Sequence, residues 1–359
     1  MDSRATIAYG LLWSVLTVYA LLAALDFGAG FYRWLAGLRG NTKARTVAQD
    51  FLNPVWEVTN VFLVLLVVGM VGFFPMAANI FGTALLLPFS LAIITLAVRG
   101  AAIGFSHLSR RPRPLFEAAI GVGGLLAPAL LVSFVAASES GAITLDAAGG
   151  GVAVSQALLW LSPLYLALAL LAMVGVTHLS ALVLYRRTLR QNDAAAAFYR
   201  RGALHSGVVS GALALVLLPA LRLTTPDHFT ALVSLWPLLL VIAAGWALAL
   251  RALLQSPSGR GSLTATVAGI ATWALALAVF GMTRLPWLLH GQVRLDAALT
   301  PPAMFTVLMV TVVLGVLILL PSLALFYMVL LRPAQPTSVP SVESAAQPER
   351  ERTLVTAGR

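Results

Sequence analysis

The stretch DFLNPVWEVTN at residues 50–60 leads directly into an apolar run from Val61 to Phe74. A run of this length, taken with the residues before it, is long enough to cross a lipid bilayer. The stretch also places an acid, Glu57, at the edge of that run, with Trp56 before it and Asn60 one helical turn after it. A carboxylate at the edge of a bilayer is costly unless it has a partner or a function. Glu57 is therefore the first candidate site residue.

The composition of the whole chain is that of a protein with many membrane spans. Of the 359 residues, 60% are hydrophobic and only 10% are charged, and the mean hydropathy is +0.92. The absence of cysteine excludes disulfides and thiolate metal sites. The net charge of +10 comes from basic residues in short loops between apolar runs, which indicates membrane topology rather than nucleic-acid binding.

Nine apolar segments are each close to or above the ~20 residues that a membrane helix needs. We expect spans at residues 7–35, 55–74, 78–103, 118–137, 154–184, 203–221, 229–254, 263–282 and 303–331. The first span lacks a clear cleavage site after it and is expected to stay as a helix. The predicted fold is all-α, with a single membrane domain over residues 1–332. Residues 333–359, rich in Pro, Ser, Gln and Glu, are expected to form a disordered cytoplasmic tail.

The distribution of basic residues predicts the orientation. Eighteen of the 23 Lys and Arg residues lie in the loops after the odd-numbered spans or in the tail, and four lie on the other side. By the positive-inside rule, the N-terminus lies outside and the C-terminus is cytoplasmic. Tyr32-Arg33 and Tyr185-Arg186 end the first and fifth spans alike, which is compatible with two four-helix units plus one extra helix.

Three charged residues are then expected in the inner part of the membrane. Asp26 lies about 13 Å from the inner end of the first span at 1.5 Å per residue, while Glu57 and Arg99 lie within about one turn of the cytoplasmic face. Asp26 is either a proton relay or a satisfied structural carboxylate. Glu57 is either a proton acceptor or an acid favoured by a helix N-terminus that Pro54 opens. Arg99 either neutralises one of these acids or extends to the headgroups.

No catalytic or metal site is expected on this chain. Two of the five histidines, His178 and His205, lie on predicted spans, but no second ligand accompanies them at a suitable spacing. The sequence has no phosphate-binding loop, dinucleotide fingerprint or hydrolase elbow in a usable setting.

Four stretches together carry a family resemblance. They are LDFGAGF at 25–31, NPVWEVTNVF at 53–62, FFP at 73–75 and RGAAIGF at 99–105. In order, spacing and topology they resemble subunit II of cytochrome bd-type quinol oxidases, most strongly over the first third of the chain. The resemblance implies a bacterial cell-membrane complex that reduces O2 to water with electrons from quinol. It also implies that haems b and d and the quinol-oxidation loop belong to a partner, subunit I.

For subunit II the resemblance implies two four-helix bundles plus a peripheral helix, without haem. This subunit stabilises the haem-bearing partner and lines a cytoplasmic proton route, and some members hold a structural quinone. Small single-span subunits are possible further partners, together with membrane lipid and quinone, but no nucleic acid.

Three residues match the motifs of the family. Asp26 matches the acid of the Asp-x-Gly-x-Gly stretch, Glu57 the acid after the tryptophan, and Arg99 the arginine that ends the third span. Glu57 and Asp26 are thus the expected proton pathway, and Arg99, Trp56 and Asn60 the expected charge partner or subunit contacts. Residues 22, 55 and 58 depart from many members, being Leu, Val and Val, which brings the chain closer to the short, cyanide-insensitive branch.

Two other functions remain open from the residues alone. A proton-coupled secondary transporter would use the same charges, but equivalent pairs of Gly- or Pro-interrupted spans are not evident in the sequence. A non-catalytic scaffold would use them only to dock a partner.

Overall fold

The computed structural model describes residues 2–108, 114–146, 151–190, 195–255 and 259–330. Within its helices, the side chains of residues 53–58, 107–108 and several after 319 lie outside the description. Residues up to Thr311 form one compact unit, and a second begins at Val312. The predicted tail at 333–359 lies outside the described residues.

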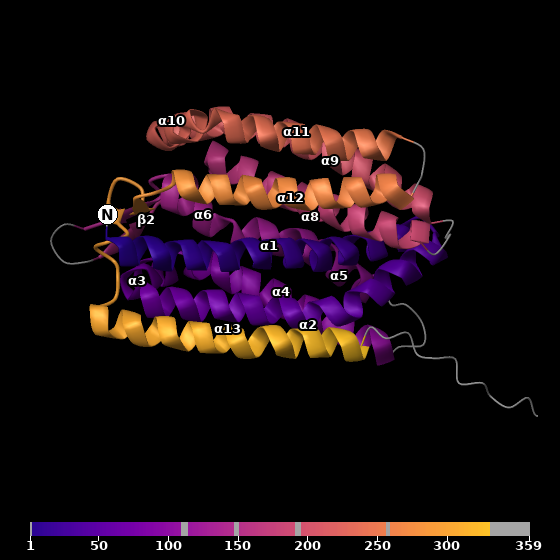
Figure 1. The fold of residues 1–359 in the computed structure, drawn as a ribbon, viewed down its shortest axis with the longest axis horizontal. Coiled ribbons are helices and arrows are strands. Elements are labelled where there is room, and N and C mark those ends of the chain that lie inside the picture. The colour runs from indigo at the N-terminus through magenta and orange to yellow at the C-terminus, as the bar shows by residue number, and fades with distance from the viewer. Residues whose placement is uncertain (1, 109–113, 147–150, 191–194, 256–258, 331–359) are drawn as a thin grey trace, which may run out of the picture. The chain divides into compact units, whose positions relative to one another are not determined.

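The described chain is almost entirely helical, with two short hairpins (Figure 1). In chain order the elements are α1 (Ser3–Leu38), α2 (Thr42–Phe73), α3 (Pro75–Ala84), α4 (Leu86–Leu108), α5 (Pro114–Leu131), α6 (Ser133–Glu139), β1 (Ile143–Leu145), β2 (Val152–Val154), α7 (Gln156–Leu161), α8 (Pro163–Arg190), α9 (Ala196–Thr224), α10 (Pro226–Ser234), α11 (Trp236–Leu254), α12 (Gly259–Thr283), β3 (Trp287–Leu289), β4 (Val293–Arg294) and α13 (Pro302–Leu330). Strands β1 and β2 pair antiparallel, as do β3 and β4.

Among the described residues, eight helices are long and apolar enough to cross a membrane, and a ninth span results when the end of α2 is counted with α3. The prediction of an all-helical, multi-span protein therefore holds in outline.

The start of α2 is set by local chemistry. The Asn41 side chain accepts a hydrogen bond from Ala44 N at the start of α2, and Gly40 has the positive φ of 64° that the preceding turn needs.

The predicted third and seventh spans begin differently from expectation. Residues 78–84 belong to α3, which bends by 117° from α2, and the apolar span begins only with α4. Residues 229–234 likewise belong to the short helix α10, before α11. The reason is proline: Pro75 and Pro226 each open a helix, and the residue before each has an extended φ, −132° and −141°. The breaks that follow these short helices, at Leu85 and Leu235, lie in apolar sequence that continues on both sides and so gives no sign of them.

These paired breaks also correct the expectation that proline interruptions are absent from equivalent positions. The series α2, α3, α4 and the series α9, α10, α11 each contain a long helix, a short helix opened by proline, and a second long helix. The breaks lie at helix ends, because α2 finishes at Phe73 and α9 at Thr224.

Helix α1 packs against α2, α5, α8 and α12 (Figure 1). Its contact with α8 is close because a glycine lies at the crossing: a Cβ on Gly28 would lie 2.1 Å from the Val176 carbonyl oxygen. The Ser180 hydroxyl of α8 lies 2.9 and 2.7 Å from the carbonyl oxygens of Ala24 and Leu25, and donates to this part of α1. Close packing of small residues is a common way to join helices in membranes.

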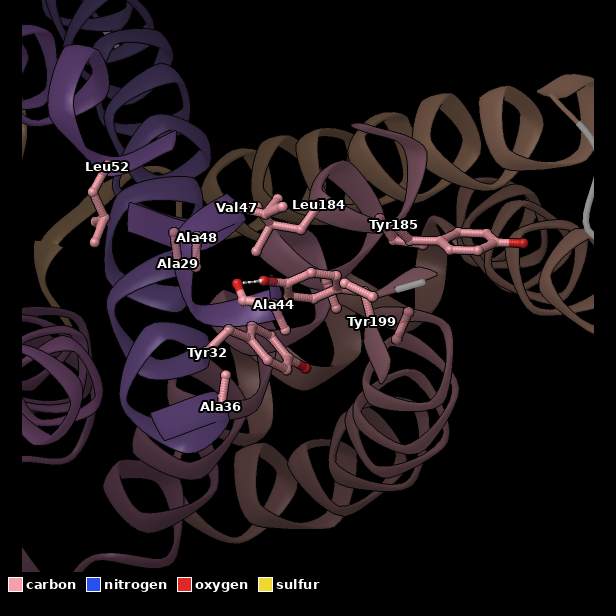
Figure 2. Close-up of a cluster of buried hydrophobic side chains, with 14 of the residues drawn as sticks. Ala29, Tyr32, Ala36, Ala44, Val47, Ala48, Leu52, Leu184, Tyr185 and Tyr199 are labelled. Carbon is pink, nitrogen blue, oxygen red and sulfur yellow. Dashed lines mark hydrogen bonds between the residues drawn. The ribbon is translucent and has the colours of Figure 1, made fainter. Parts of the chain in front are cut away.

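A buried hydrophobic cluster joins the end of α1 to α2, α8 and α9 (Figure 2). Tyr32 of α1 lies edge-on to Tyr199 of α9, with ring centroids 5.6 Å apart. The Tyr199 hydroxyl donates a hydrogen bond to the Ala44 carbonyl of α2. The polar end of a buried tyrosine is thus satisfied by a backbone carbonyl in the first turn of a helix.

Candidate functional site

Asp26 of α1 and Arg99 of α4 form a buried ion pair. Each residue is 1% exposed. Arg99 Nη1 lies 2.8 Å from Asp26 Oδ2, Nη2 lies 2.9 Å from Oδ1, and Nη2 also donates to the Asp26 carbonyl oxygen at 3.0 Å. The guanidinium lies 5.0 Å from the centre of the Phe27 ring. A two-pronged pair of this kind holds both side chains in one geometry and compensates both buried charges.

Glycines make room for the arginine. A Cβ on Gly30 would lie 3.2 Å from Arg99 Nη2, and one on Gly123 of α5 would lie 3.3 Å from Arg99 Cβ. Gly124, next along α5, lies so close to α1 that a Cβ there would lie 2.5 Å from the Phe27 carbonyl oxygen. The Gly-x-Gly after Asp26 therefore serves the close approach of α1 to both the guanidinium and α8.

A cavity of about 320 Å³ opens beside this pair. Asp26, Arg99, Thr59 and the exposed Asn60 contribute its polar lining, and apolar residues of α1, α2 and α4 complete it. Arg99 Nε is buried and has no hydrogen-bond partner among the described residues. A polar space of this size, with an unmatched donor at its wall, suits ordered water.

Glu57 and Trp56 lie on α2, but their side chains are outside the described residues. The backbone nonetheless corrects one expectation. Helix α2 begins at Thr42, so Pro54 and Glu57 lie well inside it rather than in its first turn. The interpretation of Glu57 as an acid favoured by a helix N-terminus is therefore wrong. Glu57 precedes Asn60, which lines the cavity, by three residues, or about one helical turn.

A second charged cluster lies near the end of α1 and was not predicted. Glu117 of α5 accepts from Arg33 Nη2 of α1 at 2.7 Å and from Arg45 Nη2 of α2 at 2.9 Å. Arg33 also reaches the Ser106 hydroxyl of α4 at 3.3 Å. One carboxylate and its arginine partners thus join α1, α2, α4 and α5. The sequence places Glu117 just before the apolar run at 118–137, but it does not indicate which arginines lie near this acid.

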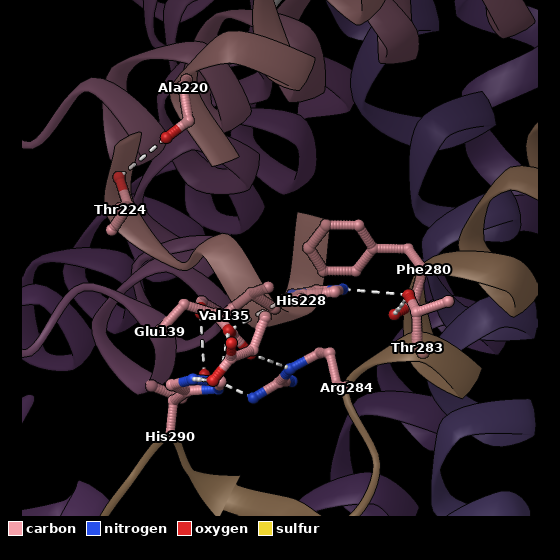
Figure 3. Close-up of polar contacts among 12 residues, drawn as sticks. Val135, Glu139, Ala220, Thr224, His228, Phe280, Thr283, Arg284 and His290 are labelled. Atoms are coloured by element: carbon pink, nitrogen blue, oxygen red, sulfur yellow. Dashed lines mark hydrogen bonds and ion pairs between the residues drawn. The ribbon is translucent and has the colours of Figure 1, made fainter. Parts of the chain in front are cut away.

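A third cluster lies at the opposite end, where α1 begins (Figure 3). Glu139 of α6 is 3% exposed and accepts from Arg284 Nε, which follows α12, at 2.6 Å. The second Arg284 nitrogen donates to the Ser138 hydroxyl. His228 of α10 places Nδ1 3.2 Å from Glu139 Oε2 and Nε2 2.9 Å from the Thr283 hydroxyl. The sequence offered no sign of this cluster, because its members come from separate elements.

The third cluster continues toward the surface through the hairpin of β3 and β4. His290 Nδ1 lies 3.7 Å from Glu139 Oε2, and His290 Nε2 lies 4.0 Å from Asp227 Oδ2. The Asp227 side chain is 91% exposed, whereas that of Glu139 is 1% exposed. The hairpin itself is held by the His290 N–H, which donates to the Ser138 carbonyl oxygen at 2.9 Å.

The two histidines on predicted spans do not come together as ligands. His178 is buried, and its Nδ1 lies 3.0 Å from the Ala203 carbonyl oxygen, so Nδ1 carries the hydrogen. His205 is exposed on α9. The described residues contain no group of three or more His, Asp or Glu side chains arranged to hold a metal ion.

An apolar cavity of about 570 Å³ lies within the compact unit. Its walls come mainly from α1, α2, α4, α5, α8 and α12. At the end where α1 begins it is lined by Tyr9, Trp13, Arg284 and Trp287. The Arg284 guanidinium lies 5.5 Å from the Trp13 ring. The lining of the cavity is therefore mainly apolar, with polar groups where α1 begins.

Comparison with known proteins agrees with this arrangement. Residues 4–330 match the family model of the cytochrome bd terminal oxidase subunit II. The putative cytochrome bd menaquinol oxidase subunit II of Bacillus subtilis (strain 168) is 29% identical over 340 residues, covering 92% of this chain and 97% of the relative. A chain in the structure of the bd oxidase from Geobacillus thermodenitrificans superposes with a TM-score of 0.78 at 30% identity, covering 92% of this chain and 100% of that chain. This chain is a multi-pass membrane protein that belongs to the cytochrome bd terminal oxidase subunit II family, and it is thus a subunit of a respiratory oxidase.

Proposed function

We propose that this chain is the haem-free subunit II of a quinol:oxygen oxidoreductase in a bacterial cell membrane. It stabilises a haem-bearing subunit I in a heterodimer and lines a cytoplasmic route for the protons consumed when O2 is reduced to water. The observation that carries the proposal is the buried Asp26–Arg99 pair, which opens onto a polar cavity in an otherwise apolar helix bundle. The departures at residues 22, 55 and 58 favour the short, cyanide-insensitive branch.

We infer an N-terminus outside and a cytoplasmic C-terminus, with two four-helix bundles and α13 as the peripheral helix. The excess of basic residues in the loops after α1, α4, α8 and α11 supports this orientation. The Arg33–Glu117–Arg45 cluster then faces the cytoplasmic side. The Glu139–Arg284–His228 cluster faces the outside.

The proton route begins at Glu57 and reaches Asp26 through the cavity lined by Thr59 and Asn60. Two features support it: the position of Glu57 one turn before the cavity, and the space for water beside the carboxylate of Asp26. The hydrogen bonds from Arg99 hold that carboxylate in place. A proton would move through water along the cavity, and Asp26 and Arg99 would set the electrostatic potential there.

The haems b and d belong to subunit I in this proposal. The hydrogen bond from His178 to the backbone and the exposed, separate position of His205 support a chain without haem ligands. A structural quinone would occupy the apolar cavity of about 570 Å³. Its isoprenoid chain would lie along the apolar walls, and its oxygens would meet the polar end near Tyr9 and Arg284.

The surface beside the polar cavity is the proposed contact with subunit I. On α2 and α4 it presents large exposed apolar side chains, including Val64, Val68, Ile94 and Val98. Asn60 lies on α2 with the first two of these, and Trp56 is one turn earlier on the same helix. Other exposed apolar faces would contact lipid, quinone or small single-span subunits.

Membranes from a host without other terminal oxidases provide the test. Quinol-dependent oxygen uptake should require both this chain and its subunit I, and neither should suffice alone. Oxygen uptake by subunit I alone at the full rate would contradict the proposed role. The match of residues 4–330 to the family model of the oxidase subunit disfavours the alternative of a secondary transporter.

A further inference from the structure

We propose that the apolar cavity opens sideways between α2 and α4, and that subunit I closes this opening when it binds. The quinone enters the cavity from the bilayer before the two subunits join, and it stays locked there in the assembled oxidase. The inference rests on the proposed function for the identity of the ligand and of the partner. It goes beyond that function by assigning the route of entry and the order of assembly.

Two residues mark the opening of the apolar cavity. Among the described lining residues, only Val67 of α2 and Ile93 of α4 are exposed, by 49% and 66%. The other described lining residues are buried or half-buried, including Tyr9 and Arg284 where α1 begins. The cavity therefore opens toward the side of the helix bundle, between α2 and α4, rather than toward the outer water.

The polar cavity beside Asp26 opens along the same strip of surface. Its exposed lining residues are Asn60 of α2 and, on α4, Ile93 and Ala97. Asn60 precedes Val67 by seven residues, or about 10 Å of helix. Buried and half-buried residues also line both cavities, namely Tyr19, Phe27, Leu63 and Leu96. The two openings thus lie one above the other on the strip between α2 and α4.

The rim of this strip is apolar and belongs to the proposed contact with subunit I. Val64 and Val68 of α2 are each 61% exposed, and Ile94 next to Ile93 is 58% exposed. Val67 lies between the two valines in the sequence, so a partner surface that covers this rim also covers the opening. The same contact that joins the subunits therefore closes the cavity.

The position of the opening suits a ligand that comes from the lipid phase. The described lining residues of α1 run from Tyr9 to Phe27, which is eighteen residues or about 27 Å of helix. The cavity therefore follows α1 across much of the apolar layer. A quinone dissolved in the bilayer passes between α2 and α4 without crossing water, and its isoprenoid chain then lies against apolar walls.

Closure by subunit I makes the ligand part of the contact between the subunits. Before assembly, the chain meets lipid at Val67 and Ile93. After assembly, it meets the apolar side chains of the partner, which pack over the opening. Exchange of the quinone then requires α2 and α4 to lose their contact with subunit I. We therefore expect the bound quinone to remain as long as the oxidase stays assembled.

Isotope exchange in growing cells tests the order of assembly. Synthesis of the oxidase is induced in unlabelled medium and then stopped, after which ¹³C-labelled isoprenoid precursors label the quinone pool. The oxidase is purified in a mild detergent, and a water-soluble quinone analogue displaces quinone from the substrate site of subunit I. The retained quinone should contain many-fold less label than the pool. Oxidase synthesised after the switch is the control and should carry the label of the pool.

A matched pair of variants tests the position of the opening. Val67→Trp narrows the space between α2 and α4. Val64→Trp is the control, because Val64 is exposed on the same helix, within the proposed contact, but is not a lining residue of either cavity. We expect several-fold less retained quinone per haem in Val67→Trp than in Val64→Trp.

Each way of failing gives a different result. Retained quinone that acquires the label of the pool in preformed oxidase would overturn the locked opening. Equal quinone per haem in the two variants would overturn its position between α2 and α4. A haem-containing oxidase without retained quinone would overturn both the locked opening and the quinone assignment. Purification of this chain without subunit I would instead contradict the proposed function.

Discussion

Asp26 and Arg99 depend on each other because neither charge has another described ionic partner at that depth. Removing one member of a buried ion pair leaves an uncompensated charge, which typically costs about 3–5 kcal/mol. We expect Arg99→Leu to reduce assembly of the oxidase strongly. The double variant Asp26→Asn/Arg99→Leu should recover part of it, because no buried charge then remains. Assembly is measured as haem-containing complex per unit of membrane protein, and a double variant no better than Arg99→Leu would contradict the pairing argument.

Glu57 gives a second prediction for a single residue. If it admits protons to the cavity beside Asp26, the amide in Glu57→Gln should lower oxygen turnover more than the shorter acid in Glu57→Asp, because only an acid can exchange a proton. Turnover per haem in purified oxidase is the measurement. Near-wild-type rates in both variants would remove Glu57 from the route.

Helix crossings extend the argument from residues to elements. Gly28 marks the contact of α1 with α8, where an added Cβ would lie 2.1 Å from the Val176 carbonyl oxygen. Gly28→Ala must separate the two helices and should lower the thermal stability of the complex. Gly10→Ala on the same helix is the matched control, since nothing lies within 4 Å of its added Cβ. A melting temperature equal in the two variants would show that the crossing tolerates the methyl group.

The Glu117 cluster predicts a similar effect near the C-terminal end of α1. Glu117→Gln removes the charge that compensates Arg33 and Arg45 and leaves two cations close together. We expect a lower melting temperature and partial recovery in Glu117→Gln/Arg45→Gln, because one of the cations is then gone. The melting temperature of the purified complex is the measurement, and equal values for the single and double variants would argue against a charge effect.

The sequence could predict an element only where the element has a recognisable pattern of residues. Hydropathy identified the long helices, because a run of about 20 consecutive apolar residues is typical of a membrane-spanning helix. It missed the breaks at Leu85 and Leu235, after the short helices α3 and α10, since apolar composition continues on both sides. The depth of each charge suggested that Arg99 neutralises Asp26 or Glu57. The Glu117 and Glu139 clusters were not predicted, because each joins residues from separate helices and the sequence alone does not show which helices pack together.

The apolar cavity is a property of the molecule as a whole, because helices from along most of the chain form its walls. Ala276 of α12 lines it, whereas Ala271 on the same helix is exposed. We expect Ala276→Trp to fill part of the cavity and lower the quinone extracted per complex, and Ala271→Trp to leave it unchanged. The quinone content after solvent extraction is compared at equal haem content. Equal quinone in both variants would place the bound quinone elsewhere.

The most direct measurement is purification of this chain, tagged, from its native membrane in a mild detergent. The account predicts that a haem-bearing subunit I of similar span number accompanies it. The reduced-minus-oxidised spectrum should show haems b and d, and the sample should consume oxygen with quinol. A stable, colourless protein without such a partner would contradict the assignment of this chain as subunit II of a quinol oxidase.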